Sequence, residues 1–205
     1  MKRILTVTVA LSLAGASLLC GCNGTAKPLP TPAPIAFPGS ADLDRARTAA
    51  AAGKLDAAAD ALSDALRTIE DAGPLRIRNL KLVEKDVPGF GLYTPLKTSA
   101  LKPGDGLFLY FEPAGMTHQF SEDLWHSDLS ADLALLLPDG TVAQDQPDFL
   151  VSTVASHAPN REIQFVMRLA TRGISEGDYA VRVTLHDRLG KKTAVEQIPV
   201  TFRIK

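Results

Sequence analysis

The chain has 205 residues, and its 22 lysines and arginines nearly balance its 23 aspartates and glutamates, for a formal net charge of −1 at pH 7. It contains no basic cluster, which argues against a nucleic acid as its partner. The length suits one ordinary domain with a small appendage, because domains of about 100–150 residues are the commonest.

The amino terminus predicts an export signal over residues 1–21. A short cationic start, Met1-Lys2-Arg3, is followed by an apolar run from Ile4 to Leu19 and then by a small residue at the expected cleavage site. These are the three regions of a secretory signal. An uncleaved membrane anchor is the alternative, although the run is short for a span of about 20 residues.

The signal ends in Leu19-Cys20-Gly21-Cys22, which resembles the lipobox of bacterial lipoproteins. The resemblance implies that the signal is cut before Cys22 and that the Cys22 thiol carries fatty acyl chains such as palmitate. Cys20 is the alternative acceptor, but Leu19 would then precede the cut, where a small residue is wanted. Because the chain has no other cysteine, we expect a membrane-anchored protein without a disulfide.

Residues 22–40 predict a tether between the lipid and the folded domain. The segment contains prolines mostly at alternate positions, namely Pro28, Pro30, Pro32, Pro34 and Pro38. Such spacing favours a polyproline II spacer, and a disordered leader is the equal alternative. Asn23, rather than an aspartate, follows Cys22. By resemblance to enterobacterial sorting, this implies the outer membrane, with the domain facing the periplasm.

Residues 41–73 predict a helical hairpin that turns at Gly53, with Ser40 as a cap and Gly73-Pro74 as the stop. After Gly53, small and large apolar residues recur at helical spacing; they are Leu55, Ala58, Ala59, Leu62, Leu66 and Ile69. This second helix resembles the second half of one tetratricopeptide repeat, whereas stable stacking needs about three repeats. A hairpin docked on its neighbour and a fragment of a peptide-binding solenoid both remain open.

Residues 74–205 change to a period of two, which is typical of half-buried antiparallel strands. Apolar and polar residues alternate most clearly over 163–169, 179–185 and 198–204. Turn sequences rich in Gly, Pro, Asp and Asn separate about seven to nine such runs with no helix between them. We therefore predict a mainly β fold, an antiparallel β-sandwich preceded by a short α-helical hairpin.

The run Gly177-Asp178-Tyr179-Ala180-Val181-Arg182-Val183 resembles strand F of immunoglobulin-like and fibronectin type III-like domains. The resemblance implies that Tyr179 closes a corner by bonding back to the backbone, that 187–192 is the loop before the last strand, and that 193–204 is that strand. It covers about the last third of the chain and carries the fold, not an activity. The missing cysteine pair favours the relatives that lack the disulfide.

The segment 111–128 is the most unusual part of the domain, since it holds the only tryptophan and two of the four histidines. Its candidate binding residues are His118, Phe120, Trp125 and His126. Three interpretations remain open: a loop whose aromatic residues plug the end of the sandwich, a surface that recognises a carbohydrate or peptide, and a copper-type metal site that uses Met116 and the two histidines.

No catalytic or nucleotide-binding motif is present, so we expect neither an enzyme nor a cofactor. His186 is expected on the solvent face of its strand, and Asp128, Asp132 and Asp139 are expected to be solvated turn acids rather than a calcium site. The sequence therefore predicts a non-enzymatic cell-envelope lipoprotein whose sandwich is a structural or protein-interaction module, with an envelope protein as partner. The alternative is a lipoprotein that binds a ligand through residues 111–128.

Overall fold

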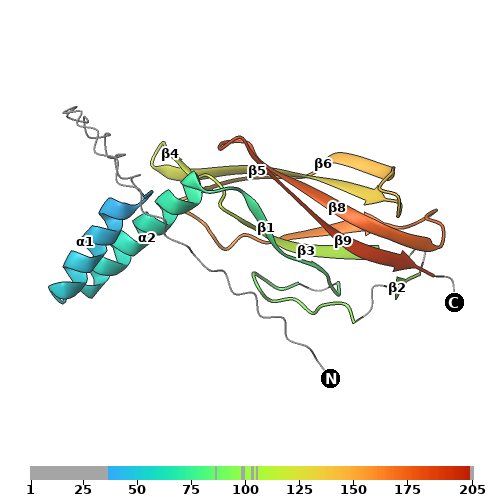
Figure 1. Ribbon diagram of the computed structural model, residues 1–205, viewed down its shortest axis with the longest axis horizontal. Helices are drawn as coiled ribbons and strands as arrows, with labels where there is room; N and C mark the ends of the chain where they lie inside the picture. Colours follow the sequence, from blue (N-terminus) through green and yellow to red (C-terminus); the bar gives the residue numbers. More distant parts are fainter. Residues whose placement is uncertain (1–36, 86, 98–99, 103, 105, 204–205) are drawn as a thin grey trace, which may run out of the picture. The chain divides into compact units, whose positions relative to one another are not determined.

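The computed structural model describes residues 37–85, 87–97, 100–102, 104 and 106–203 (Figure 1). The predicted export signal, Cys22 and most of the proline-rich tether lie outside these residues, so the predictions about them stand untested. Within the described part of the chain, no helix is long and apolar enough to span a bilayer.

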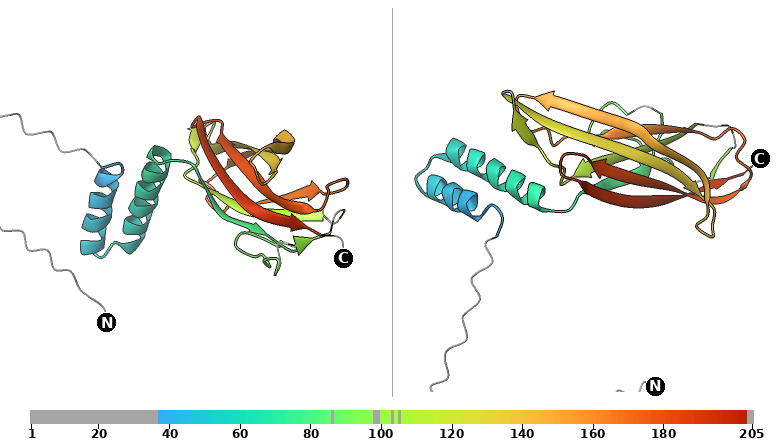
Figure 2. Two further views of the ribbon diagram at one scale, coloured as in Figure 1. Left: turned by 45° about the vertical axis from the view of Figure 1, so that its right-hand side comes forward. Right: turned by 90° about the horizontal axis from the view of Figure 1, so that it is seen from above.

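Two antiparallel helices open the folded region, as predicted. Helix α1 (Ser40–Ala51) and helix α2 (Leu55–Ala72) are joined by a tight turn in which Gly53 has a φ of 71°, a left-handed conformation that glycine adopts without strain. Figures 1 and 2 show the helices side by side. Ser40 does not cap α1 as expected, because the cap position is Gly39 and the helix starts at Ser40 itself.

The predicted apolar stripe of α2 is only partly buried. The buried residues of the helix are three alanines, Ala58, Ala61 and Ala65. Their small side chains let helices approach closely, whereas the large residues Leu55, Leu62 and Leu66 are 70%, 53% and 45% exposed. We name Leu55, Ala59, Leu62 and Leu66 the leucine stripe. A single helical hairpin does not test the resemblance to a tetratricopeptide repeat, which therefore stays a prediction.

The rest of the described chain forms two sheets that enclose one core, antiparallel except for the short β2, which pairs in parallel with β9. This confirms the predicted sandwich and its helical hairpin. The smaller sheet has the order β1-β3-β7 and the larger has the order β2-β9-β8-β5-β4, with β6 also paired to β5. Their bounds are β1 Arg76–Leu82, β2 Ala100–Leu101, β3 Gly106–Ala114, β4 Gln119–Ser121, β5 Leu124–Leu136, β6 Val142–Ser156, β7 Phe165–Ala170, β8 Gly177–Asp187 and β9 Lys192–Phe202.

This strand order is the immunoglobulin-like one. The smaller sheet corresponds to strands A, B and E, and β9-β8-β5-β6 corresponds to strands G, F, C and C′. The tyrosine corner predicted for Tyr179 is present, because its hydroxyl donates to the carbonyl oxygen of Ser175 at 3.2 Å. Val181, which stands where antibody domains carry the second cysteine, is fully buried in the core.

The core follows the alternation that the sequence predicted. Alternate residues of β7 and β8 are buried, and they pack with inward residues of β3, β5 and β9 into a single apolar cluster. At its centre the rings of Phe111 and Phe165, one from each of two neighbouring strands, lie with their centroids 5.3 Å apart. Each fully buried side chain of this size contributes about 1.5–3 kcal/mol to folding.

The segment 111–128 is not one loop, as one of the three interpretations had it. Strand β3 continues to Ala114, and β4 and β5 form a hairpin whose two turn residues, Glu122 and Asp123, have φ values of 52° and 61°. Positive φ at both central positions is the type I′ turn that matches the twist of a hairpin. The pair Glu-Asp is not the usual Asn-Gly or Asp-Gly sequence for this turn, which explains why the hairpin was not predicted.

Strand β6 is a long edge strand that pairs only with β5 among the described strands. The strand runs unbroken from Val142 to Ser156. Its register against β5 shifts at Pro147 and Asp148, where Asp148 has a φ of 46°. A β-bulge therefore interrupts the regular pairing at this point.

The end of α2 is held to the sandwich by Lys192, the first residue of β9. Its Nζ donates to the carbonyl oxygens of Glu70 at 3.2 Å, Asp71 at 2.8 Å and Gly115 at 3.0 Å. The last carbonyls of a helix have no partner within the helix and attract a cation. Lys192 therefore satisfies the end of α2 and a sandwich loop at the same time.

Candidate functional site

The four residues predicted to bind a ligand do not share one cleft. His118 is buried, and its Nε2 lies 3.0 Å from the carbonyl oxygen of Asn160. Phe120 and Trp125 face each other across β4 and β5, whereas His126 is paired with Gln119. Neighbouring positions of a strand point to opposite faces, so His126 lies on the other side of the hairpin from the aromatic pair.

The aromatic pair is only partly open to solvent, because Phe120 is exposed and Trp125 is half-buried. The rings of Phe120 and Trp125 are 5.1 Å apart, Phe120 is 56% exposed, and the guanidinium of Arg67 lies 5.0 Å from the Trp125 ring centroid. The interpretation that both aromatics plug the sandwich is therefore wrong, because the hairpin turns Phe120 outward. In the described residues no three His, Cys, Asp or Glu side chains gather closely enough to hold a metal ion.

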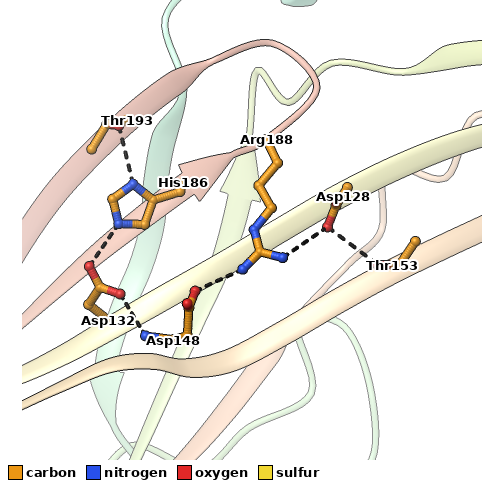
Figure 3. A network of polar contacts seen from close by, with 7 residues as sticks. All are labelled: Asp128, Asp132, Asp148, Thr153, His186, Arg188 and Thr193. Carbon is orange, nitrogen blue, oxygen red and sulfur yellow. Dashed lines mark hydrogen bonds and ion pairs between the residues drawn. The ribbon is translucent and has the colours of Figure 1, made fainter.

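A second group of polar residues lies on the outer face of the larger sheet (Figure 3). His186 is not simply hydrated, contrary to expectation: its Nε2 lies 2.8 Å from Asp132 Oδ2 and its Nδ1 lies 3.4 Å from Thr193 Oγ1. Asp132 and His186 are diagonal neighbours on β5 and β8, a separation that cross-strand pairs can bridge. Asp128 and Asp132 are thus strand residues, while Asp139 lies in a turn as expected.

The group continues through Arg188, which lies 2.8 Å from Asp148 Oδ1 and 3.9 Å from Asp128 Oδ1. Burial pushes the pKa of Asp132 upward, but the hydrogen bonds from His186 and from the Asp148 N–H together hold that pKa below its ordinary value. The Thr193 hydroxyl, the His186 imidazole and the Asp132 carboxylate form a row of contacts, but this row lies on an open sheet face. We interpret them as cross-strand contacts that fix the register of β5, β6, β8 and β9.

A third group is buried beneath residues 87–97, on the outer face of the smaller sheet. Tyr110 is fully buried and Glu112 is 4% exposed, although both point away from the core side of β3. The Tyr110 hydroxyl donates to Glu112 Oε1 at 2.6 Å and accepts from the Gly91 N–H at 2.8 Å. The ring of Tyr93 covers that of Tyr110, with centroids 4.3 Å apart.

The other Glu112 oxygen, Oε2, accepts from Asn79 Nδ2 at 2.7 Å. Asn79 has a φ of 53° within a register shift of β1 against β3, a left-handed conformation that asparagine tolerates better than most residues. The bulge therefore aims the amide of Asn79 at the buried carboxylate. Backbone strain beside a buried charge is a pattern that clusters at functional sites.

Burial and the hydrogen bond to Glu112 raise the pKa of Tyr110 to about 12, despite the opposing effect of the Gly91 N–H. The hydroxyl therefore keeps its proton and remains a donor throughout the physiological range. Both oxygens of Glu112 accept a hydrogen bond, Oε1 from Tyr110 and Oε2 from Asn79. We name Asn79, Tyr110 and Glu112 the buried triad after its two buried members, Tyr110 and Glu112; Asn79 itself is exposed at the edge of the group.

A cavity of about 210 Å³ opens beside the buried triad. Glu112, Arg78 and Met116 come from the sandwich side, Phe90 comes from the covering loop, and α2 contributes Leu66 and Glu70. Glu70 is paired with Arg161, whose Nε lies 2.9 Å from Glu70 Oε2. Both charged and apolar groups thus converge on one small, partly open space, as in many ligand sites.

Sequence reasoning missed this cavity, although one signal pointed to it. The run Leu107 to Phe111 is apolar at every position, which indicates a strand covered on both faces rather than half-solvated. The covering segment contains Pro88-Gly89-Phe90-Gly91-Leu92-Tyr93. Nothing in the spacing, however, shows that this loop folds back over its own neighbouring strands.

No family model and no curated protein sequence matches the chain. Among solved structures, it is similar to the sporulation control protein of Bacillus subtilis, with 12% identity and a TM-score of 0.37. That similarity covers 65% of this chain and 51% of the other, so the chain spans about half the length of the sporulation protein.

The PKD domain of an M14-like peptidase from a Thermoplasmatales archaeon has 13% identity and a TM-score of 0.33, over 64% of this chain and 98% of the domain. A CARDB domain from Pyrococcus furiosus, solved in complex with di-metal ions, has 11% identity and a TM-score of 0.32, over 64% and 93%. Similarities this low link the chain to no family and no activity.

Proposed function

We propose that this chain is a non-enzymatic lipoprotein of the bacterial cell envelope, anchored through Cys22, whose folded region is a protein-interaction module. The outer membrane, facing the periplasm, is its proposed location. The leucine stripe carries the proposal. Three leucines that are 45–70% exposed on one face of one helix are more apolar surface than a free helix normally presents.

The proposed partner presents a basic amphipathic helix. Leu55, Ala59, Leu62 and Leu66 follow the spacing by which one helix receives the apolar face of another. Helix α2 carries five acidic residues and one arginine. Of these, Asp56 and Asp60 are exposed, and no ion pair is found for either among the described residues. Opposite charge on the partner would speed association and favour it over acidic competitors.

A photo-crosslinking amino acid at Ala59 tests this surface in living cells. We expect it to capture one defined envelope protein, and we expect Leu62→Asp to abolish the adduct without unfolding the chain. Ala57 is the matched control, since two residues along a helix turn the side chain by about 200°. Equal capture from positions 57 and 59 would contradict the proposal.

The lipid anchor predicts a separate result. Labelled palmitate is expected to enter the full-length chain, and the Cys22→Ser variant is expected to take up none and to leave the membrane fraction. Cys20→Ser serves as the control and should label normally. Labelling that persists in Cys22→Ser and is lost in Cys20→Ser would move the anchor to Cys20.

The pair of exposed Phe120 and half-buried Trp125 favours a second function, the stacking of a sugar or an apolar peptide on the β4–β5 hairpin. The same crosslinking experiment separates the two functions. A probe at Phe120 that captures a glycan or peptide, combined with no capture from Ala59, would favour this hairpin over the leucine stripe.

A further inference from the structure

The cavity beside the buried triad contains a buried acid without a basic partner. Glu112 accepts one hydrogen bond at each oxygen from a neutral donor, and no ion pair reaches it among the residues that the structure describes. A carboxylate has about four acceptor positions, so two remain for another donor. A buried charge is costly unless a counter-charge compensates it.

A basic residue without a partner lines the same cavity. Arg78 stands directly opposite Glu112 on the neighbouring strand, so both side chains lie on the same face of the sheet. No ion pair joins Arg78 to Glu112 or to another described residue. The other two charged residues of the cavity, Glu70 and Arg161, pair with each other. Glu112 and Arg78 are therefore the two charged residues of the cavity without an ion-pair partner among the described residues.

The remaining walls are apolar. Met116 is buried, and Phe90 and Leu66 line the cavity while remaining partly open to solvent. The hydroxyl proton of Tyr110 is already donated to Glu112, which holds the carboxylate in one orientation. A ligand would therefore meet a fixed acid, a more exposed base and an apolar wall within about 210 Å³.

We infer that this cavity binds a small zwitterion, a free α-amino acid with an apolar side chain. Its ammonium group donates to Glu112, its carboxylate pairs with Arg78, and its side chain packs on Phe90, Leu66 and Met116. Arginine suits this role because its planar guanidinium can hold a carboxylate with two parallel hydrogen bonds. The site is independent of the lipid anchor.

Calorimetric titration of the full chain, purified in detergent, with three probes tests the inference. L-Leucine has both charged groups, 3-methylbutylamine lacks the carboxylate, and 4-methylpentanoate lacks the amine. We expect leucine to bind, and each truncated probe to bind at least about tenfold more weakly, because each loses a charge-assisted interaction. Absence of binding by leucine overturns the inference, and equal binding of the amine overturns the zwitterion class.

Matched variants test which charged group of the ligand Arg78 and Glu112 each bind. Arg78→Gln is expected to weaken leucine about tenfold while leaving 3-methylbutylamine unchanged. Arg76→Gln is the control, because Arg76 is exposed on the same face of β1 and does not line the cavity. Glu112→Gln is expected to weaken both probes. If that buried variant does not fold, the Arg78 comparison decides alone; equal leucine affinity in the Arg76 and Arg78 variants overturns the inference.

Discussion

Replacement of Lys192 by methionine is expected to lower the free energy of unfolding by about 4 kcal/mol. The ammonium group donates to three carbonyl oxygens, two at the end of α2 and one at Gly115. A hydrogen bond from a charged donor is worth about 1.5–3 kcal/mol. Methionine keeps the apolar stem and removes all three, while water can reach part of this half-buried site. Urea denaturation measures the loss.

Lys191→Met is the matched control, because Lys191 is exposed and directly precedes Lys192. It should change stability by less than about 0.5 kcal/mol, as most surface substitutions do. Hydrogen exchange adds a spatial readout: in Lys192→Met the amides of α2 should exchange faster than those of β8. Equal denaturation curves for the two lysine variants would show that Lys192 does not hold the hairpin.

Replacement of Tyr110 by phenylalanine is expected to cost about 3 kcal/mol at neutral pH. The ring and its packing on Tyr93 are kept, but Glu112 Oε1 loses a donor and the Gly91 N–H loses an acceptor. Leaving a buried polar group unsatisfied costs about 1–3 kcal/mol for each group. Chemical denaturation of the variant measures this loss.

The same variant should change the alkaline stability profile. The pKa of Tyr110 rises from 10.0 to about 12 on folding, so the folded protein keeps this proton where the unfolded chain has released it. The resulting stabilisation is fully present below pH 10 and is lost as the pH rises through 12. Two pKa units correspond to about 2.7 kcal/mol. Tyr110→Phe should remove this part of the pH dependence.

Tyr93→Phe controls for the loss of a phenol, because it keeps the ring stacked on Tyr110 while leaving the Tyr110 hydroxyl intact. This variant should retain the steep fall in stability between pH 10 and pH 12. If Tyr110→Phe and the unmodified protein lose stability in parallel over that range, the Tyr110 proton is not held by burial and Glu112.

The sandwich could be predicted because its signals are local. Alternation of apolar residues in β7 and β8 reflects one wet and one buried face, and the tyrosine corner depends on Tyr179 and the residue four positions before it. Such patterns can be recognised from residues that lie close together in the sequence. The helical hairpin could be predicted for the same reason, since Gly53 and the apolar stripe of α2 lie within twenty residues of each other.

The candidate sites could not be predicted because their residues meet only after the sheets have paired. Asp132 and His186 are 54 positions apart, and Asn79 reaches Glu112 across 33 positions through a bulge. The ligand site expected at 111–128 failed to converge for the same reason. The two-residue turn at Glu122 and Asp123, which the sequence did not predict, sets the pairing of β4 with β5. This pairing places His126 on the face opposite Phe120 and Trp125.

The irregularity in β6 has a consequence for contacts between two copies of the chain. A straight edge strand of 15 residues with unpaired backbone groups could form hydrogen bonds with the same strand of a neighbouring molecule. Pro147 has no amide hydrogen to offer, and the left-handed backbone at Asp148 bends the strand there. Both features therefore disfavour edge-to-edge pairing of β6 between two copies of the chain.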